Sequence, residues 1–345
     1  MANNNFKPFA AAGGANVMAQ ADYEALAALL TGFQSGTAQS AQLNKVWRQS
    51  SIMAAVLAQF IVDLTGQDAI DDGTTATLLA NLKTAVQAQS AAVVGQARNL
   101  TMSVVSASSS ATLTADEIVV GTALGGQKYV LKQFSKVINL ATTGAGGMDT
   151  GAAPSSGYVA VYAIYSPVKA AQHASDPITY PDDGRALLAT NATSAVAPNV
   201  YGGANMPSGY TASALVSVWA TNASSQLIVG YQVDRTIYIN RTQVFNTSTQ
   251  QSSYTPLSLS SIVPRNAREV IGDISGSTGG NTSGNIQMSI ASTNVIGIGG
   301  VYPTFLAYGQ MYYKIPLITA QTVYYIAITT AGTLSFQINT TGYTI

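Results

Sequence analysis

The spacing of apolar residues changes after Ser103, and this change divides the chain into two differently built parts. In the first part, apolar side chains recur every three or four residues, which is the period of an amphipathic helix. In the second part they alternate with polar ones, between clusters of Gly, Asn, Ser and Pro that are typical of turns. The pattern predicts an α+β fold in which helices and strands are segregated, with the helices at the amino terminus.

Three helices are expected in the first part. The first follows Asp22 and ends before Gly32, the second runs from after Ser40 to Gly66, and the third begins after a turn at residues 71–73. Strong helix formers fill these segments, and a glycine at a helix end readily adopts the left-handed conformation that terminates it.

Residues 1–20 are small, polar and rich in glycine. Only Phe6, Pro8 and Phe9 offer anchoring side chains, so we expect an extended arm that another part of the structure holds in place. With the first helix it forms an attachment region over residues 1–35.

The third helix carries a ridge of residues whose steps alternate between three and four. This is heptad spacing, and the ridge consists of Leu79, Leu82, Val86, Gln89, Val93, Gln96 and Leu100. Buried glutamines need polar partners, which symmetry-related copies or trapped water could supply. The spacing favours a homo-oligomeric, parallel coiled coil within a helical region at residues 36–105. The alternative is an amphipathic helix that packs through its alanines on its own chain.

The alternating segments predict two mainly antiparallel β-sandwich domains, at residues 111–241 and 255–345. Residues 158–165 alternate between two faces, and the Ala331-Gly332 pair indicates a β-hairpin. The polar stretch at residues 246–253 buries little surface, so it marks the boundary between the two domains.

Composition excludes several kinds of chemistry. The chain has no Cys and one His, His173, so thiolate catalysis, zinc sites with several imidazoles and Ser-His-Asp arrangements lack their side chains. We expect no metal and no cofactor. Lys and Arg together number 15 and equal Asp and Glu, so no positive field favours nucleic-acid binding. No stretch of 18 apolar residues and no signal peptide is visible, which predicts a protein made in a cytoplasm without membrane insertion.

Two parts of the sequence resemble a known family. The first resembles the amino-terminal region of tail-fibre proteins from tailed bacteriophages and prophages. The residues that carry this resemblance are Asn5–Phe9, Gly14–Val17, Ala21–Leu26, Gly32–Gly36, Asn44-Lys45 and Arg48-Gln49. A second set is similar to a β module found in many such fibres: Gly146–Gly151, Tyr158–Tyr165, Met206–Thr211 and Val218–Asn222.

The resemblance implies a virion component that forms a homotrimer. Its amino-terminal end would attach to tail or baseplate proteins, and its carboxy-terminal end would bind a host surface polysaccharide or outer-membrane protein. By this analogy we expect the tail-docking surface to contain Phe6, Phe9, Tyr23, Leu26 and Leu29. The heptad ridge would form the trimer axis.

An aromatic cluster near the carboxy terminus is the best candidate for receptor binding. It consists of Tyr302, Phe305, Tyr308, Tyr312 and Tyr313. Tyrosine combines a rigid apolar ring with a hydrogen-bonding tip, which suits stacking on a sugar or anchoring a protein loop. Aromatic residues are also common in strands for structural reasons.

Two alternatives to receptor binding remain open: a tailspike depolymerase and a purely structural collar or baseplate subunit. Glycan cleavage needs two carboxylates, one of which has a raised pKa. The carboxylates after residue 118 are Asp149, Asp176, Asp182, Asp183, Asp234, Glu269 and Asp273. Asp234 and Glu269 each adjoin an arginine that could neutralise the carboxylate. We do not expect an enzyme. Asp182-Asp183-Gly184 indicates a turn because it lacks the distal acidic ligand of a calcium loop. We expect His173 in a polar surface loop.

Overall fold

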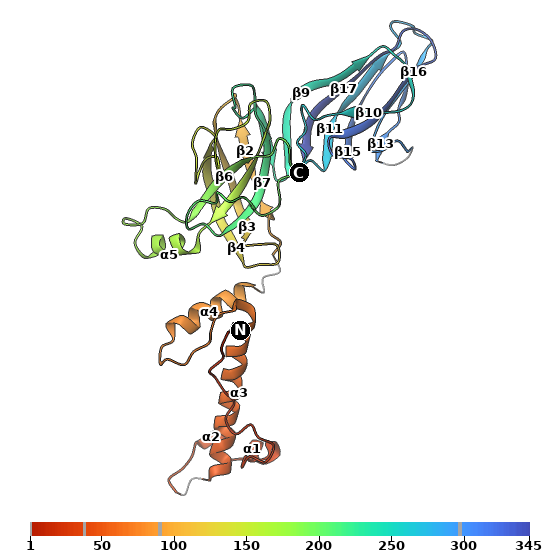
Figure 1. The fold of residues 1–345 in the computed structure, drawn as a ribbon. Coiled ribbons are helices and arrows are strands. Elements are labelled where there is room, and N and C mark those ends of the chain that lie inside the picture. The colour runs from red at the N-terminus through yellow and green to blue at the C-terminus, as the bar shows by residue number, and fades with distance from the viewer. Residues whose placement is uncertain (1, 37–38, 89–91, 296–298) are drawn as a thin grey trace. The chain divides into compact units, whose positions relative to one another are not determined.

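The computed structural model describes residues 2–36, 39–88, 92–295 and 299–345 (Figure 1). The chain forms two compact units, a helical unit at residues 1–91 and a β unit at residues 92–345. The segregation predicted from the sequence is confirmed. The helical part ends earlier than residue 105, because the strands at residues 97–104 belong to the β unit.

The helices of the helical unit are α1 (Gln20–Glu24), α2 (Ala28–Thr31), α3 (Ser40–Thr65) and α4 (Ala76–Ala88). The long helix ends as expected at Gly66, which has φ 65° and donates its N–H to the Val62 carbonyl. The helix expected after Asp22 is instead the two short helices α1 and α2. Neither buries a residue, so packing does not stabilise a longer helix there.

The amino-terminal arm is held by its own chain. The N–H of Asn5 donates to the Ala69 carbonyl at 3.0 Å, and the N–H of Ala69 donates to the Asn3 carbonyl at 2.9 Å. Further along the arm, the N–H of Phe9 donates to Ser51 Oγ on α3 at 2.8 Å. Backbone hydrogen bonding therefore keeps this glycine-rich segment extended.

The heptad ridge does not lie on one helix, so the predicted coiled coil over residues 79–100 is wrong. Helix α4 ends at Ala88, and Gly95 has φ +88°, a conformation that a continuing helix does not allow. Val93 and Gln96 lie in the turn before β1, at the start of the β unit, and Leu100 is 1% exposed within the core of that unit. Burial of Leu100 with the strands outweighs the heptad pattern. Gln89 lies outside the described residues.

The first strands of the β unit are β1 (Ala97–Arg98), β2 (Thr101–Val104), β3 (Ser110–Gly121), β4 (Lys128–Asn139), β5 (Tyr158–Tyr165), β6 (Arg185–Asn191), β7 (Ala212–Ala220) and β8 (Gly230–Val233). Helix α5 (Pro167–Ser175) lies between β5 and β6. The following strands are β9 (Thr236–Thr247), β10 (Gln251–Ser258), β11 (Glu269–Ser277), β12 (Asn285–Ala291), β13 (Gly300–Val301), β14 (Thr304–Leu306), β15 (Tyr308–Pro316), β16 (Thr322–Thr329) and β17 (Ser335–Thr344).

Among the described residues, the named strands pair antiparallel in two sheets. The 12-stranded sheet has the order β15-β11-β17-β9-β8-β2-β3-β7-β5-β6, with β1 and β4 also paired to β3. The 5-stranded sheet has the order β10-β16-β12-β13, with β14 paired to β12. The antiparallel β prediction is confirmed, but one sheet runs through both expected sandwich domains. The expected boundary stretch lies at the end of β9 and the start of β10, where the chain passes from one sheet to the other.

The expected hairpin at Ala331-Gly332 is also wrong in its pairing. Gly332 has φ +83° and makes the predicted turn. However, β16 pairs with β10 and β12, whereas β17 pairs with β11 and β9. The turn therefore connects two different sheets, because local turn chemistry does not determine which strand each arm pairs with.

Strand β5 is buried on both faces. Val159, Val161 and Ala163 join the main core, which continues from the early strands into the carboxy-terminal strands. Tyr158 and Tyr162 face the other way, into a second buried cluster. The predicted alternation of residues 158–165 between two faces is confirmed. Both faces are apolar because each one is covered.

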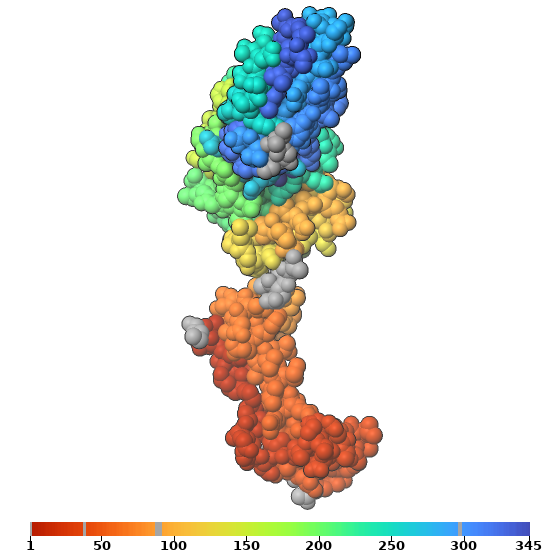
Figure 2. All heavy atoms as spheres, turned by 90° about the vertical axis from the view of Figure 1, so that its right-hand side faces the viewer, coloured from red at the N-terminus to blue at the C-terminus, as the bar shows by residue number. Residues whose placement is uncertain are grey.

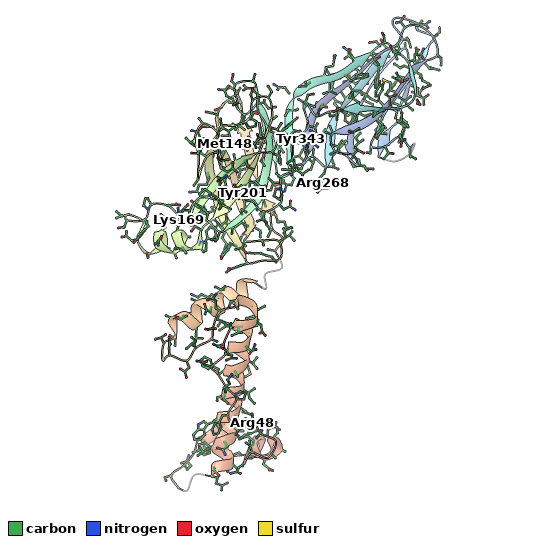
Figure 3. The ribbon with its side chains drawn as sticks, in the orientation of Figure 1. Arg48, Met148, Lys169, Tyr201, Arg268 and Tyr343 are labelled. Carbon is green, nitrogen blue, oxygen red and sulfur yellow. The ribbon has the colours of Figure 1, made fainter. Side chains whose placement is uncertain are left out.

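Side-chain hydrogen bonds fix the early strands of the β unit to the late ones. The buried hydroxyl of Tyr343, which Figure 3 labels, donates to the Val218 carbonyl at 2.8 Å. The hydroxyl of Tyr158 donates to the Ser260 carbonyl at 3.0 Å. These bonds and the continuous sheet make residues 92–345 one structural body.

We expect Tyr343→Phe to lower the free energy of unfolding of the β unit by about 1 kcal/mol, because it removes one buried hydrogen bond. Tyr343→Ala should cost about 3–5 kcal/mol, since it also leaves a cavity. Denaturant unfolding of the purified chain measures both. Tyr231→Phe, at an exposed tyrosine on β8, is the matched control and should be neutral. Equal stability of Tyr343→Phe and the wild type would contradict the prediction.

Candidate functional site

The outer face of the late strands carries an exposed aromatic and polar surface. Strands β9, β17, β11 and β15 lie next to one another in the large sheet, and Figure 2 shows them as adjoining teal and blue bands. Along β15, Tyr313 and Ile315 point into the core, so Tyr308, Gln310 and Tyr312 point outward. We call this surface the tyrosine face and define it by Arg241, Asp273, Tyr308, Gln310 and Tyr312.

A buried carboxylate lies at the centre of the tyrosine face. The side chain of Asp273 is 1% exposed, whereas that of its partner Arg241 is about half exposed. Arg241 donates two hydrogen bonds to it, from Nε to Oδ1 at 2.8 Å and from Nη2 to Oδ2 at 2.7 Å. Gln310 Nε2 and Asn339 Nδ2 also donate to Oδ2, each at 3.1 Å. The two-pronged arginine contact fixes the guanidinium plane at the surface.

These contacts keep Asp273 ionised. Burial by itself raises the pKa of its carboxyl group, because it removes water from the charge. The hydrogen bonds and positive charge of Arg241, with the amides of Gln310 and Asn339, outweigh burial and hold the pKa of Asp273 below its usual value. Asp273 therefore accepts hydrogen bonds and positions Arg241 rather than supplying a proton.

The two tyrosines flank this network and face solvent. Tyr308 is 61% exposed and Tyr312 is 76% exposed. Tyr312 pairs in register with Asp273, and Tyr308 pairs with Ser277 on the same neighbouring strand. Small serines on β11 leave the rings accessible. Flat rings beside fixed hydrogen-bonding groups form a surface suited to stacking on a sugar ring.

The other members of the expected aromatic cluster do not join this surface. Tyr313 is buried, and its hydroxyl donates to the Asn339 carbonyl at 2.9 Å. Phe305 is half-buried against the main core, and Tyr302 lies between β13 and β14, beside the smaller sheet. Strand alternation and sheet exchange separate residues that are close in sequence. Arg241 and Gln310 have no sequence signal that marks them as site residues, because only the sheet pairing brings them to Asp273.

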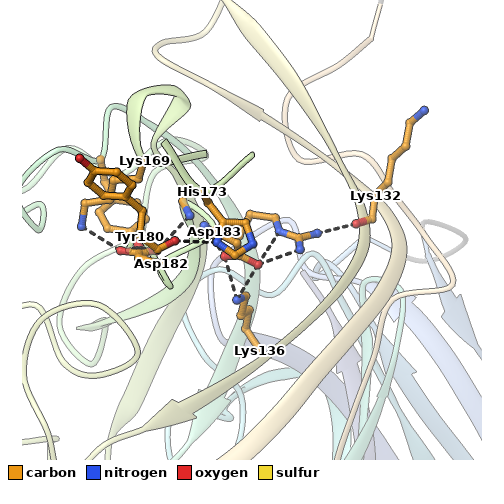
Figure 4. Close-up of polar contacts among 10 residues, drawn as sticks. Lys132, Lys136, Lys169, His173, Tyr180, Asp182 and Asp183 are labelled. Carbon is orange, nitrogen blue, oxygen red and sulfur yellow. Dashed lines mark hydrogen bonds and ion pairs between the residues drawn. The ribbon is translucent and has the colours of Figure 1, made fainter. Parts of the chain in front are cut away.

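A second polar cluster surrounds α5 (Figure 4). Asp183 binds Lys136 Nζ at 2.9 Å and Arg185 Nη2 at 2.7 Å, and Asp182 binds Lys169 Nζ at 2.9 Å. His173 lies on α5 rather than in the expected loop, and its Nδ1 is 2.7 Å from the Tyr180 carbonyl oxygen. These contacts connect α5 and the following loop to the sheet.

Both carboxylates of the α5 cluster are poor proton donors. Burial raises the pKa of each, but the ammonium of Lys169 and the Gly184 N–H hold the pKa of Asp182 below its ordinary value. Lys136 and Arg185 do the same for the pKa of Asp183. A general acid that cleaves glycans requires the opposite shift.

Within the described residues, no group of three or more His, Asp and Glu side chains is arranged to hold a metal ion. The same part of the chain contains no helix with the length and apolar character needed to span a bilayer.

The expected tail-docking residues lie on the helical unit with different exposures. Phe9 and Leu29 are exposed, and the Phe9 ring contacts Trp47 edge-on with centroids 5.7 Å apart. Phe6 packs against the small core of this unit, Leu26 is half-buried, and Lys45 Nζ lies 5.8 Å from the Tyr23 ring centroid. The sequence analysis missed Leu30, which is 95% exposed.

Helix α3 also leaves an apolar stripe at the surface. Met53, Val56 and Leu57 are exposed, and Phe60 and Leu64 are half-buried at the following positions of the same face. The steps from Met53 to Leu57, Phe60 and Leu64 are four, three and four, which is heptad spacing. In the expected ridge, Leu79 and Val86 are exposed on α4 but Leu82 is half-buried. The longer apolar stripe is therefore on α3.

No family model and no curated protein matches this sequence. Among solved structures, a Bacillus thuringiensis Cry1Da tryptic core variant is 8% identical, with a TM-score of 0.18 over 76% of this chain and 54% of that chain. The chain thus spans about half the length of that protein. A structure of the T13 IBDV viral particle is 9% identical, with a TM-score of 0.21 over 72% of this chain and 69% of that chain. Similarity this low carries no argument about fold or function.

The lowered pKa of Asp273 predicts a pH-dependent contribution to stability. A carboxyl with a depressed folded pKa stabilises the fold above its unfolded value, about 3.9, and this contribution is lost as pH falls through the folded pKa. We therefore expect Asp273→Asn to be less stable than the wild type at neutral pH by about 1–3 kcal/mol. The difference should shrink as pH falls below about 4.

Thermal unfolding across this pH range measures the effect. Asp116→Asn, at an exposed aspartate on β3 that accepts one hydrogen bond from Asn99 Nδ2 at 2.6 Å, is the control and should cost less stability at neutral pH than Asp273→Asn. A difference between Asp273→Asn and the wild type that stays constant down to acid pH would show that the ionised carboxylate is not the stabilising group.

Proposed function

We propose that this chain is a tail-fibre protein of a tailed bacteriophage or prophage and acts in the virion during adsorption. Its amino-terminal unit attaches to tail or baseplate proteins, and its carboxy-terminal strands bind a receptor on the host surface. The observation that carries the proposal is the tyrosine face, where two exposed tyrosines flank an arginine fixed by a buried carboxylate.

The chemistry of the tyrosine face favours a polysaccharide receptor. Tyr308 and Tyr312 offer two flat stacking surfaces on one strand, and Gln310 lies between them. A flat strand face with separate aromatic rings can contact successive units of an extended chain, while the exposed part of Arg241 and the phenol groups supply hydrogen bonds. An outer-membrane protein loop is the alternative receptor.

The electrostatics favour binding over cleavage. Asp182, Asp183 and Asp273 each pair with a cation that lowers the carboxyl pKa, so each is ionised at neutral pH. A tailspike depolymerase would use one protonated carboxyl beside one ionised carboxylate. These aspartates supply acceptors without a proton donor, which supports a recognition role.

The surface of the helical unit supports assembly into a homotrimer. Among its described residues, the cluster of buried apolar side chains consists of Ala58, Val62 and Ala69, while Met53, Val56 and Leu57 of the stripe remain exposed. An apolar heptad stripe on an exposed helix face is stabilised when copies of the helix pack together. Three linked receptor-binding ends would then turn later contacts into intramolecular ones and raise avidity.

The receptor prediction concerns Tyr308 and Tyr312. We expect the double substitution to Ala to reduce binding of the chain to host cells at least about tenfold. The reason is that each aromatic ring that stacks on a flat group of a ligand contributes about 1 kcal/mol or more to binding. A pull-down on intact host cells measures bound protein. Tyr231→Ala removes an exposed tyrosine outside the tyrosine face and should bind as the wild type does.

Two results would oppose the receptor role. Unchanged cell binding by the double variant would show that the tyrosine face does not contact the receptor, as expected for a purely structural collar subunit. Release of reducing ends from host polysaccharide by the purified chain would instead support a depolymerase.

The assembly prediction concerns α3. Leu57→Glu places a charge in the apolar stripe, so we expect the chain to sediment as a single copy where the wild type sediments as three. Analytical ultracentrifugation measures the mass directly. Val168→Glu, at an exposed valine on α5, is the control and should leave assembly unchanged. A wild-type chain that sediments as one copy would contradict the trimer.

A further inference from the structure

A cavity of about 580 Å³ lies between early and late segments of the β unit, and arginines dominate its polar lining. Arg235 enters it from the β8–β9 turn, and Arg265 and Arg268 enter from the segment before β11. Figure 3 labels Arg268 beside this junction. Its volume falls in the range typical of small-molecule sites.

These arginines differ from the others of the β unit in their partners. Arg98 pairs with Glu117, Arg185 with Asp183, and Arg241 with Asp273. The three remaining arginines have no carboxylate partner within the described residues. In a chain with only 15 basic residues, three arginines without an Asp or Glu partner in one cavity concentrate positive charge there.

The carboxylates that adjoin these arginines in the sequence do not pair with them in the structure. Glu269 adjoins Arg268 but its carboxylate binds Lys314 Nζ at 3.0 Å. Asp234 adjoins Arg235 but its Oδ1 accepts the N–H of Leu100 at 3.2 Å. The described residues that line the cavity include no Asp or Glu side chain. The expected local charge compensation is therefore wrong for both pairs.

The walls of the cavity are held in place before any ligand binds. Arg235 donates from Nη1 to the Leu215 carbonyl at 2.8 Å and from Nη2 to the Gly95 carbonyl at 2.6 Å. Asn266 Nδ2 donates to the Ala197 carbonyl at 2.8 Å, and its Oδ1 accepts the Ala197 N–H at 2.9 Å. This reciprocal pair joins the two walls, so little ordering is required on binding.

We propose that this cavity binds a small anionic molecule through Arg265 and Arg268, with Arg235 adding positive charge behind them. The ligand carries a carboxylate or phosphate group on a body of sugar size. Guanidinium groups match both anions through paired N–H donors. Apolar side chains of Val196, Leu317 and Ile318 contact the body of the ligand. The site is independent of the tyrosine face and of the proposed receptor role.

Isothermal titration calorimetry of the full chain tests the proposal with three probes: glucuronate, inorganic phosphate and neutral glucose. We expect heat of binding with at least one anion, weakened by added salt, and none with glucose. The double variant Arg265→Gln with Arg268→Gln should bind that anion at least about tenfold more weakly, because charge-assisted hydrogen bonds are lost.

Arg98→Gln is the matched control, since it removes an exposed arginine elsewhere on the β unit, and should bind as the wild type does. Arg268→Lys retains the charge and should restore part of the affinity that Arg268→Gln loses. Circular dichroism confirms that each variant folds, and single Arg268→Gln serves if the double variant does not.

The proposal is overturned if neither glucuronate nor phosphate binds. Equal weakening by Arg98→Gln would likewise overturn it, because the effect would then reflect total charge. Binding of phosphate alone identifies a phosphoryl ligand and binding of glucuronate alone a carboxylate ligand, and either supports the site.

Discussion

The double pairing of β9 is the constraint on which the β unit depends. Residues 236–239 of this strand pair with β8 on one edge, and β17 pairs with the other edge from residue 236 to residue 247. The backbone hydrogen-bond ladder therefore passes from the early strands into the late ones. Tyr343 and Asn266 reinforce the same junction through side-chain bonds. Both candidate sites follow from this arrangement: the tyrosine face because Arg241 lies on β9, and the arginine cavity because the walls come from both groups of strands.

Charge is scarce in this protein, and its placement separates structural from functional surfaces. Around α5, the aspartates and lysines neutralise one another and anchor a loop. On the tyrosine face, Asp273 holds Arg241 while the rings remain free for contact. In the cavity, Arg235 donates to backbone carbonyls, and none of the three arginines pairs with an Asp or Glu side chain within the described residues. Arg265 and Arg268 are exposed, so an anionic ligand can reach their guanidinium groups.

In the helical unit, apolar surface rather than charge is left without a partner. Its arm and its long helix are well specified by backbone hydrogen bonds, yet little apolar surface is buried between them. Large side chains along α3, together with Leu30 on α2, remain accessible. A small core of this kind gains stability mainly by covering that surface, and packing of copies through α3 is the proposed means.

The sequence by itself determined that the long helices precede the strands and that the longest helix ends at Gly66. These features depend on local conformation and on the period of the apolar residues. It did not determine which strands pair. The turn at Gly332 was predicted, but the partners of β16 and β17 lie in different sheets. Leu100 fits the heptad spacing in the sequence, but in the structure it is buried in the core of the β unit. Arg241 and Asp273 are 32 residues apart, and only the packed sheet brings them together. Long-range pairing decides these features because burial and hydrogen bonding between distant segments outweigh local preference.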